Sequence, residues 1–263
     1  MNENLPTYKT DGLEFVVNIE RNYVYLKDSY DPSVSFCEMT YTGEGYSFYY
    51  DTKPYSDDFD PDTYRLINLP QKVVLDPVAM SVKYGLTIGE IKTKSDFDII
   101  VDQQIVKERM LGVLPRILID GYPFIIDMRL HELRPVDLFH SRIALDKLDT
   151  IPGSLPFTPI PGYCGFYQRD KKAMMDTDVI ERLTNIPEDL MYLELPGEIA
   201  LDPFHYARQG NYDLKDILLK YPPKREPSAK LLHISKTNLA AVVAENRKKK
   251  EQPTQHRRPR LRK

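Results

Sequence analysis

The chain has 263 residues, of which 41% are hydrophobic and 29% charged. This composition is typical of a folded globular protein and excludes wholesale disorder. The net charge of −3 is unevenly placed, because residues 247–263 hold nine Lys and Arg against one Glu and so carry +8. Residues 1–246 therefore carry −11, and an acidic body precedes a basic segment.

The signals that would direct a chain into or across a membrane are not seen in this sequence. No apolar run approaches the roughly 18 to 20 residues that a membrane span needs. Residues Met1 to Pro6 have neither the basic nor the apolar region of a secretory signal. Cys37 and Cys164 lie far apart and form no CxxC pair, which favours reduced thiols. We therefore expect a cytoplasmic protein without a membrane partner.

The first predicted element is a strand that follows a tight turn. Asp11-Gly12 is a turn signal, and the β-branched and aromatic run Phe15 to Ile19 after it favours a strand. The segment from Leu5 to Ile19 recurs at a constant offset of 109 as Leu114 to Met128, with its own Asp-Gly pair. The second segment is therefore predicted to form the same turn and the strand Phe124 to Met128.

A hairpin is predicted next. The tyrosine-rich stretches Val34 to Thr42 and Tyr46 to Asp51 are separated by Gly43-Glu44-Gly45. Gly45-Tyr46 is matched later by Gly162-Tyr163, so a strand is expected there as well.

Two short helices are the most secure helical predictions. The sequence Leu-Asp-Pro occurs at Asp76-Pro77 and again at Asp202-Pro203, each time after a Leu-Pro pair six residues earlier. The Asp side chain can accept a backbone N–H as N-cap, and Pro at the first helical position has no N–H to leave unsatisfied.

The last elements of each copy are predicted to be a strand and a closing helix. The first copy has the apolar run Phe97 to Val101 and then Asp102 to Met110, and the second has Leu231 to Ile234 and then Ser235 to Asn246. The repeated order indicates a tandem duplication of one α+β unit, with repeat unit 1 at 1–112 and repeat unit 2 at 113–246. Whether the copies pack as one domain or two is left open.

The opening of the second copy, from Leu114 to Pro135, resembles a family of uncharacterised bacterial proteins with the same two-copy layout. The later Leu201-Asp202-Pro203 and the Leu-Ala and Asn-Arg-Lys end of the body also fit this resemblance. It implies the internally duplicated architecture and transfers no activity, catalytic residue or cofactor.

The basic segment is the strongest functional cue. Pro253 and Pro259 interrupt it and no apolar period runs through it, so residues 247–263 are predicted to be a disordered tail. Such an arm can neutralise phosphates of DNA or RNA and gain affinity from counterion release, or it can remain a solvated terminus. The predicted nucleic-acid-binding residues are Arg247, Lys248, Lys249, Lys250, Arg257, Arg258, Arg260, Arg262 and Lys263.

A second nucleic-acid cue lies in residues 80–91. Met80 to Ile91 has the small residue, turn glycine and flanking apolar positions of a helix-turn-helix, with Gly85 at the turn. Ile88 to Lys92 is short for a recognition helix, and the other copy, Ala207 to Leu214, loses the spacing, so packed structural helices are the competing interpretation.

Three places in the sequence are candidates for a chemical site. The acidic loop 57–62 lacks the turn glycine and terminal Glu of a calcium loop. His131, Glu132, Asp137 and His140 lack zincin spacing, because Pro135 interrupts any helix between the histidines. Cys164 lies in an apparent strand without a partner base. We assign no catalytic residue, metal ligand or cofactor.

Tyrosine is abundant, with 18 residues, and could form a recognition face. The candidates are Tyr41, Tyr46, Tyr49, Tyr50 and Tyr55, although packing within a sheet would explain many of them equally well. The sequence thus favours a non-enzymatic cytoplasmic binding or adaptor protein, whose body engages an unknown protein partner and whose tail contacts nucleic acid. Two alternatives stay open: a DNA-binding accessory or regulatory protein that uses residues 80–91, and an enzyme with a site between the two copies.

Overall fold

A computed structural model describes residues 5–27, 33–52, 63–138, 141–151 and 162–251. The described residues divide into two compact units, both of which contain strands and helices, so the fold is α+β. Unit 1 holds the described residues up to Val113 together with Glu198–Arg225, and unit 2 holds the rest. The compact units therefore do not follow the predicted copies. Within the described residues, no helix has the length and apolar character needed to cross a membrane.

Unit 1 begins with sheet A, an antiparallel sheet in the order β1-β2-β3-β4. Its strands are β1 (Thr7–Thr10), β2 (Leu13–Asn18), β3 (Tyr23–Leu26) and β4 (Val34–Ser35). The predicted turn between β1 and β2 is confirmed, because Asp11 and Gly12 have φ of 48° and 76°, the left-handed pair that a two-residue hairpin requires. The strand prediction for Phe15 to Ile19 is confirmed by β2 up to Asn18.

Sheet B packs on sheet A and has the order β5-β6-β7. Its strands are β5 (Thr40–Tyr41), β6 (Gly45–Asp51) and β7 (Tyr64–Pro70). The predicted hairpin forms between β5 and β6, but Val34–Ser35 pairs with β3 in sheet A instead. Phe15 of sheet A lies 5.5 Å from Tyr50 of sheet B, centroid to centroid, and both belong to one buried cluster.

Five helices follow sheet B in the chain. They are α1 (Lys72–Leu75), α2 (Pro77–Tyr84), α3 (Ile88–Ile91), α4 (Asp96–Ile100) and α5 (Gln103–Met110). The predicted N-cap Asp76 is confirmed, since it accepts the Ala79 N–H. Asp102 caps α5 by accepting the N–H groups of Gln104 and Ile105. The strand predicted at Phe97 to Val101 is wrong: Ser95 and Asp98 form a capping box, and this reciprocal cap starts α4.

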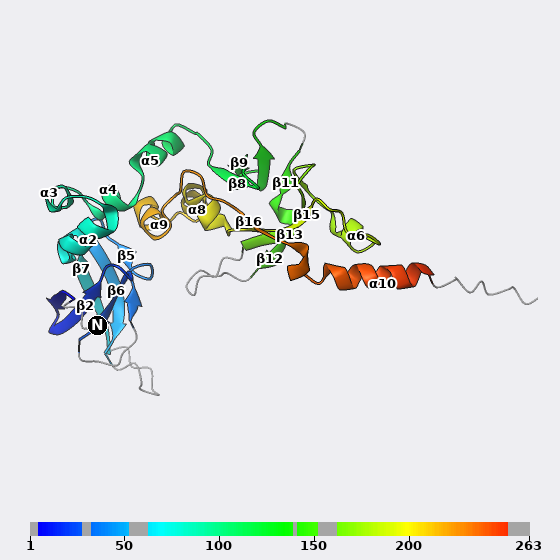
Figure 1. The fold of residues 1–263 in the computed structure, drawn as a ribbon. Helices are drawn as coiled ribbons and strands as arrows, with labels where there is room; N and C mark the ends of the chain where they lie inside the picture. The colour runs from blue at the N-terminus through cyan, green and yellow to red at the C-terminus, as the bar shows by residue number, and fades with distance from the viewer. Residues whose placement is uncertain (1–4, 28–32, 53–62, 139–140, 152–161, 252–263) are drawn as a thin grey trace, which may run out of the picture. The chain divides into compact units, whose positions relative to one another are not determined.

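Three helices from the second half of the chain complete unit 1. They are α7 (Glu198–Leu201), α8 (Pro203–Gln209) and α9 (Leu214–Lys220), and Figure 1 shows the orange α9 near the cyan α4. Phe204, Leu218 and Leu219 enter the same buried cluster as Phe15 and Tyr50. Asp202 caps α8 by accepting the His205 N–H, which confirms the second Asp-Pro helix.

Unit 2 begins with sheet C, in the order β11-β10-β9-β8. Its strands are β8 (Arg116–Ile119), β9 (Tyr122–Asp127), β10 (Glu132–Pro135) and β11 (Ile143–Ala144). Every residue pair of sheet A recurs 109 positions later, as in Tyr8 with Phe15 and Ile117 with Phe124. The turn also recurs, with φ of 53° and 74° at Asp120 and Gly121.

Sheet D, with the order β12-β13-β15-β16, is the second sheet of unit 2. Its strands are β12 (Asp149–Ile151), β13 (Gly162–Gln168), β15 (Leu190–Leu195) and β16 (Lys230–Leu232), and β14 (Ala173–Met174) pairs with β13. The 3-10 turn η2 (Leu145–Lys147) and helix α6 (Thr177–Ile180) lie between these strands in sequence. Gly162, like Gly45 in β6, opens its strand where a Cβ would clash with the carbonyl of the neighbouring strand.

The C-terminal helix differs from its prediction at both ends. Ser235 lies in the 3-10 turn η3 (Ile234–Lys236), and helix α10 runs from Leu239 to Glu251. Leu239 and Val243 of α10 are buried. The start of the predicted disordered tail is therefore helical, because Arg247 to Glu251 continue α10; residues 252–263 lie outside the described part of the chain.

Candidate functional site

The basic end of α10 is fixed to the loop that follows α6. The Asn246 amide donates to the carbonyls of Glu181 and Leu183, at 2.7 and 2.9 Å. Arg247 donates through Nε to the carbonyl of Thr184 and through its terminal nitrogen to Asn185 Oδ1 at 2.8 Å. Arg247, one of the residues predicted to contact nucleic acid, fastens the helix through two hydrogen bonds that its guanidinium donates.

The lysines after Arg247 have a different environment. Lys248, Lys249 and Lys250 are exposed in the last turn of α10, where the helix dipole favours positive charge. Lys249 also pairs with Glu245 at 2.7 Å, and this bond lowers the pKa of the Glu245 carboxyl. The remaining predicted contacts, Arg257, Arg258, Arg260, Arg262 and Lys263, lie outside the described residues.

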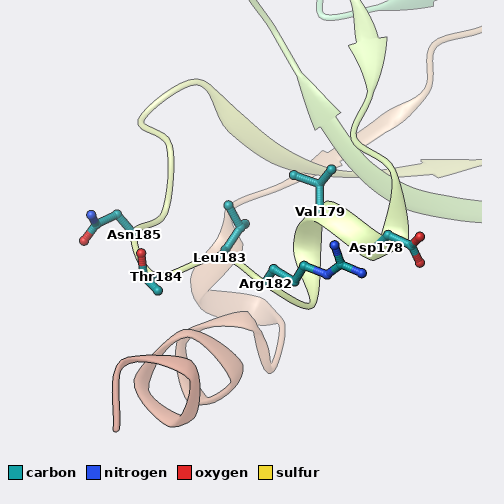
Figure 2. A pocket seen from close by; sticks show the side chains of 6 residues that line it. All are labelled: Asp178, Val179, Arg182, Leu183, Thr184 and Asn185. Atoms are coloured by element: carbon teal, nitrogen blue, oxygen red, sulfur yellow. The ribbon is translucent and has the colours of Figure 1, made fainter. Parts of the chain in front are cut away.

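A hollow of about 400 Å³ adjoins the anchor of α10. Figure 2 shows the six side chains that line it along α6 and the loop after it, with α10 close by; they are Asp178, Val179, Arg182, Leu183, Thr184 and Asn185. Thr184 and Asn185 also accept from Arg247, so the hollow and the helix share one wall. Arg182 is exposed there and adds a cation beside the basic helix.

A larger groove of about 810 Å³ lies beside β12, β13 and α6 in unit 2. Its lining mixes apolar side chains such as Phe166, Met174 and Met175 with charged ones such as Arg142 and Asp149. A mixed lining of this kind suits a peptide or protein segment better than one small charged molecule.

Cys164 lines this groove but is 2% exposed within β13. No histidine is among the groove's described lining residues. Burial and then hydrogen bonding to Cys164 raise the pKa of the Tyr192 hydroxyl, so this phenol stays protonated at neutral pH.

The histidine and acid cluster also serves structural roles. His131 is exposed in a turn with φ of 49°, and Glu132 is buried beside Arg134 and Arg142. Asp137 accepts from the Tyr122 hydroxyl at 2.7 Å, which lowers the pKa of this carboxyl. His140 and the acidic loop 57–62 lie outside the described residues, and no potential metal-binding group of three or more His, Cys, Asp or Glu occurs among the described ones.

The helix-turn-helix segment forms α2, a turn at Gly85 and α3, but α3 has one turn. Lys83 donates to the carbonyls of Ile19 and Glu20, and Thr87 forms a capping box with Glu90. The Lys83 and Thr87 side chains are therefore both used in local contacts. The apparent loss of spacing in the second half is also wrong, because Thr87 and Asp213, 126 residues apart, are both N-caps.

The candidate tyrosine face divides into two groups. Tyr41, Tyr46 and Tyr50 are at most 7% exposed and belong to the core, so for these three the alternative of packing within a sheet holds. Tyr49 is 73% exposed, and Tyr55 lies outside the described residues. Alternation along β6 explains the split, since successive side chains point to opposite sides of a strand.

Two polar clusters were missed by the sequence analysis. In unit 1 the fully buried Asp96 accepts from the Tyr46 hydroxyl at 2.6 Å and from the N–H groups of Lys72 and Val73. The Lys72 amine donates to Asn22 at 2.7 Å, and burial lowers its pKa to about 8. These residues lie far apart in sequence, and no local pattern marks them.

The second missed cluster lies on sheet C. Asp127 and Glu132 are directly opposite each other on β9 and β10, where two like charges would repel. Arg134 lies 3.1 Å from Asp127 and 3.3 Å from Glu132, and Arg142 lies 3.4 Å from Glu132. The positive charges of Arg134 and Arg142 offset the repulsion between Asp127 and Glu132, so this cluster stabilises sheet C. Glu132 and Arg134 are two residues apart and so lie on one side of β10, and this spacing is the sequence signal that could have found the cluster.

Comparisons of this chain with protein-family models, with curated protein sequences and with solved structures find no significant match.

Proposed function

We propose that the chain is a non-enzymatic cytoplasmic binding or adaptor protein, in which the basic C-terminal segment contacts nucleic acid and the body engages a protein partner. One observation carries the nucleic-acid part: Asn246 and Arg247 fasten α10 to unit 2, so Lys248 to Lys250 project from an anchored helix. Holding these cations on a fixed helix reduces the conformational entropy that they lose on binding.

The charge distribution supports the same proposal. Residues 247–263 carry +8, and residues 1–246 carry −11, so the acidic body disfavours phosphate contact elsewhere. Contacts to phosphate release counterions and make affinity fall with salt, at a slope of about −0.9 per neutralised phosphate on B-form DNA. With no aromatic residue in 247–263, base stacking by this segment is not part of the proposal.

We also infer that the body arose by tandem duplication. Support comes from the strand registers of sheets A and C, which match at an offset of 109. The caps of α2 and α8 agree too: Asp76 has φ −148° and ψ 81°, and Asp202 has φ −147° and ψ 83°.

Salt-dependent binding to mixed-sequence DNA and RNA tests the nucleic-acid proposal. Deletion of residues 248–263 keeps the Arg247 anchor and should abolish a mobility shift that weakens steeply with salt. The triple variant Lys248→Gln, Lys249→Gln and Lys250→Gln should reduce the salt slope on DNA by roughly 2 to 3. The matched control replaces three exposed lysines of unit 1, Lys92→Gln, Lys94→Gln and Lys107→Gln, and should leave the slope unchanged. An unaltered shift after the deletion would contradict the proposal.

A further inference from the structure

The outer side of sheet B presents an exposed apolar pair. Tyr49 and Leu66 are opposite each other in the ladder of β6 and β7, and they are 73% and 47% exposed. Ser47 and Asn68 extend this side by one pair, and we call these four residues the Tyr49 face. The opposite side of β6 fills the core with Tyr46, Phe48 and Tyr50. Adjacent large apolar side chains on a sheet surface mark a contact surface.

In sheet D, the face that corresponds to the Tyr49 face is covered by other segments of the same chain. Phe166 comes four residues after the opening glycine of β13, as Tyr49 does in β6, and it is opposite Tyr192. The Phe166 and Tyr192 rings lie 5.3 Å apart and neither side chain is fully exposed. Phe166 packs against one hydrophobic cluster from β15, α6, η3 and α10, namely Leu190, Ile180, Ile234, Leu239 and Val243.

Unit 1 has no comparable cover among its described residues. Its hydrophobic cluster draws on α1 to α4, α8 and α9, and neither Tyr49 nor Leu66 belongs to it. The described helices of unit 1 thus serve the inner core, whereas unit 2 uses α6 and the start of α10 on the outer side of its sheet.

Charge adds a second constraint on what binds here. The described residues of sheet B and its connections, 36–52 and 63–71, contain three acidic residues and one basic residue. The segment that covers the corresponding face of sheet D is basic, because residues 234–250 contain five Lys and Arg and one Glu. A basic occupant would gain electrostatic attraction near sheet B that an acidic one would lose.

We propose that the Tyr49 face binds an amphipathic, positively charged helix of a partner protein, with apolar residues four apart as Leu239 and Val243 are in α10. The site deepens the protein-partner part of the proposed function and rests on it. Docking of the apolar stripe of a helix on such a surface uses the i, i+4 spacing that places both side chains on one side. Tyr49 supplies amphipathic contact area with few rotatable bonds, which suits a binding surface.

The test uses a fluorescein-labelled peptide of residues 234–250 as the probe and the full chain as the receptor. Fluorescence anisotropy should show binding to the wild-type chain and at least tenfold weaker binding to the double variant Tyr49→Ser and Leu66→Ser. The peptide with Leu239→Asp and Val243→Asp should lose affinity to the same degree. Both receptor side chains are exposed, so the variant should fold, and circular dichroism and thermal unfolding check this.

A matched receptor control removes apolar surface elsewhere in unit 1. Val78 and Val82 on α2 are 58% and 80% exposed and lie four apart, and Val78→Ser with Val82→Ser should leave peptide affinity unchanged. Absence of peptide binding, equal loss in both receptor variants, or loss in the control alone would overturn the proposal. Sedimentation that shows self-association through Tyr49 and Leu66 would assign the face to a second copy of the chain and would also overturn it.

The nucleic-acid assay separates this proposal from the proposed function as a whole. The Tyr49→Ser and Leu66→Ser variant should retain the salt-dependent mobility shift, because Lys248 to Lys250 are unchanged. Failure of peptide binding with a retained shift removes the helix site alone. Peptide binding with no shift in the wild-type chain removes the nucleic-acid part and leaves the helix site standing.

Discussion

Sheet B and sheet D pair their long strands in the same register, with Tyr49 opposite Leu66 in one and Phe166 opposite Tyr192 in the other. The outer side of sheet D is packed against α6, η3 and α10, whereas Tyr49 and Leu66 face solvent. Equal backbone pairing therefore does not imply equal burial. What the rest of the chain places on a sheet decides whether its outer side adds to stability or remains available for binding.

The helix pairs α1–α2 and α7–α8 extend this comparison. Asp76 and Asp202 have nearly identical backbone angles, and each accepts the N–H three residues on. Asp202 also forms an ion pair with Arg109 at 2.6 Å. The Asp202 side chain is 3% exposed and the Arg109 side chain is 9% exposed. The local sequence therefore produces the same N-cap at Asp76 and at Asp202. At Asp202 a contact with the distant Arg109 adds a buried ion pair.

The largest expected effect on the free energy of unfolding distinguishes the N-cap Asp202 from the N-cap Asp76. Arg109→Ala leaves the Asp202 carboxylate buried without its charged partner, and it should lower the free energy of unfolding of unit 1 by about 3 to 5 kcal/mol. Asp76→Ala removes only a cap and should cost about 1 kcal/mol. Urea denaturation of both variants measures the difference, and equal losses would show that the Arg109 pair adds no more than a cap.

The next effect separates the two outer faces. Phe166→Ser removes a half-buried ring from a packed cluster and should destabilise unit 2 by about 2 to 3 kcal/mol. Tyr49→Ser changes an exposed position and should alter the free energy of unfolding of unit 1 by less than about 0.5 kcal/mol. Thermal unfolding of the two variants provides the measurement. A large loss from Tyr49→Ser would mean that this ring is part of the core of unit 1.

A pH effect distinguishes the first residues of α1 and α7, which are Lys72 and Glu198. Burial lowers the pKa of Lys72 to about 8 in the folded state, while the unfolded chain keeps the ordinary value near 10.4. Between these values the unfolded chain binds more protons, so stability should rise with pH from about 8 to 10, on the order of 2 kcal/mol. Above about pH 10 the trend should reverse, because burial raises the pKa of Tyr46 and the unfolded tyrosine ionises first.

Urea midpoints at pH 8, 9 and 10 measure this rise for the wild-type chain and for Lys72→Met. The variant lacks the amine and should show a flatter profile, with the partly buried Lys83 supplying the remainder, because burial lowers its pKa as well. A rise of equal size in Lys72→Met would assign the pH dependence to other groups.

The smallest expected effect concerns the anchor of α10. Asn246→Ala removes two hydrogen bonds to the loop after α6 and should cost about 1 kcal/mol of local stability. Hydrogen exchange should then quicken in the last turns of α10 while sheet C stays protected. Unchanged exchange in α10 would show that Arg247 alone holds the helix.

Local signals predicted much of the fold. Asp11-Gly12 and Asp120-Gly121 marked hairpin turns because two successive left-handed residues need such side chains, and Asp76-Pro77 and Asp202-Pro203 marked helix starts. The sequence predicts a strand at 97–101 because a run of five residues is too short to show the hydrophobic periodicity of a helix. The structure has a helix there, since the capping box of Ser95 and Asp98 starts α4. Strands β7 and β15 were not predicted, although they hold the partners of Tyr49 and Phe166.

The candidate sites were less predictable, because they depend on contacts between distant segments. Composition identified the basic segment, but nothing local showed that Arg247 would bond to Thr184 and Asn185. Alternation along β6 predicts that Tyr49 and Tyr50 point to opposite sides, yet it does not say which side the core occupies. The packing of Phe15 against Tyr50 decides that question.

Hydroxyl-radical footprinting of the full chain, alone and with the peptide of residues 234–250, tests the central comparison most directly. Tyr49 and Leu66 should react rapidly in the free chain and become protected when the peptide binds, while Phe166 and Tyr192 should react more slowly in both samples. Equal reactivity of Tyr49 and Phe166 in the free chain, or no change at Tyr49 with saturating peptide, would contradict the account.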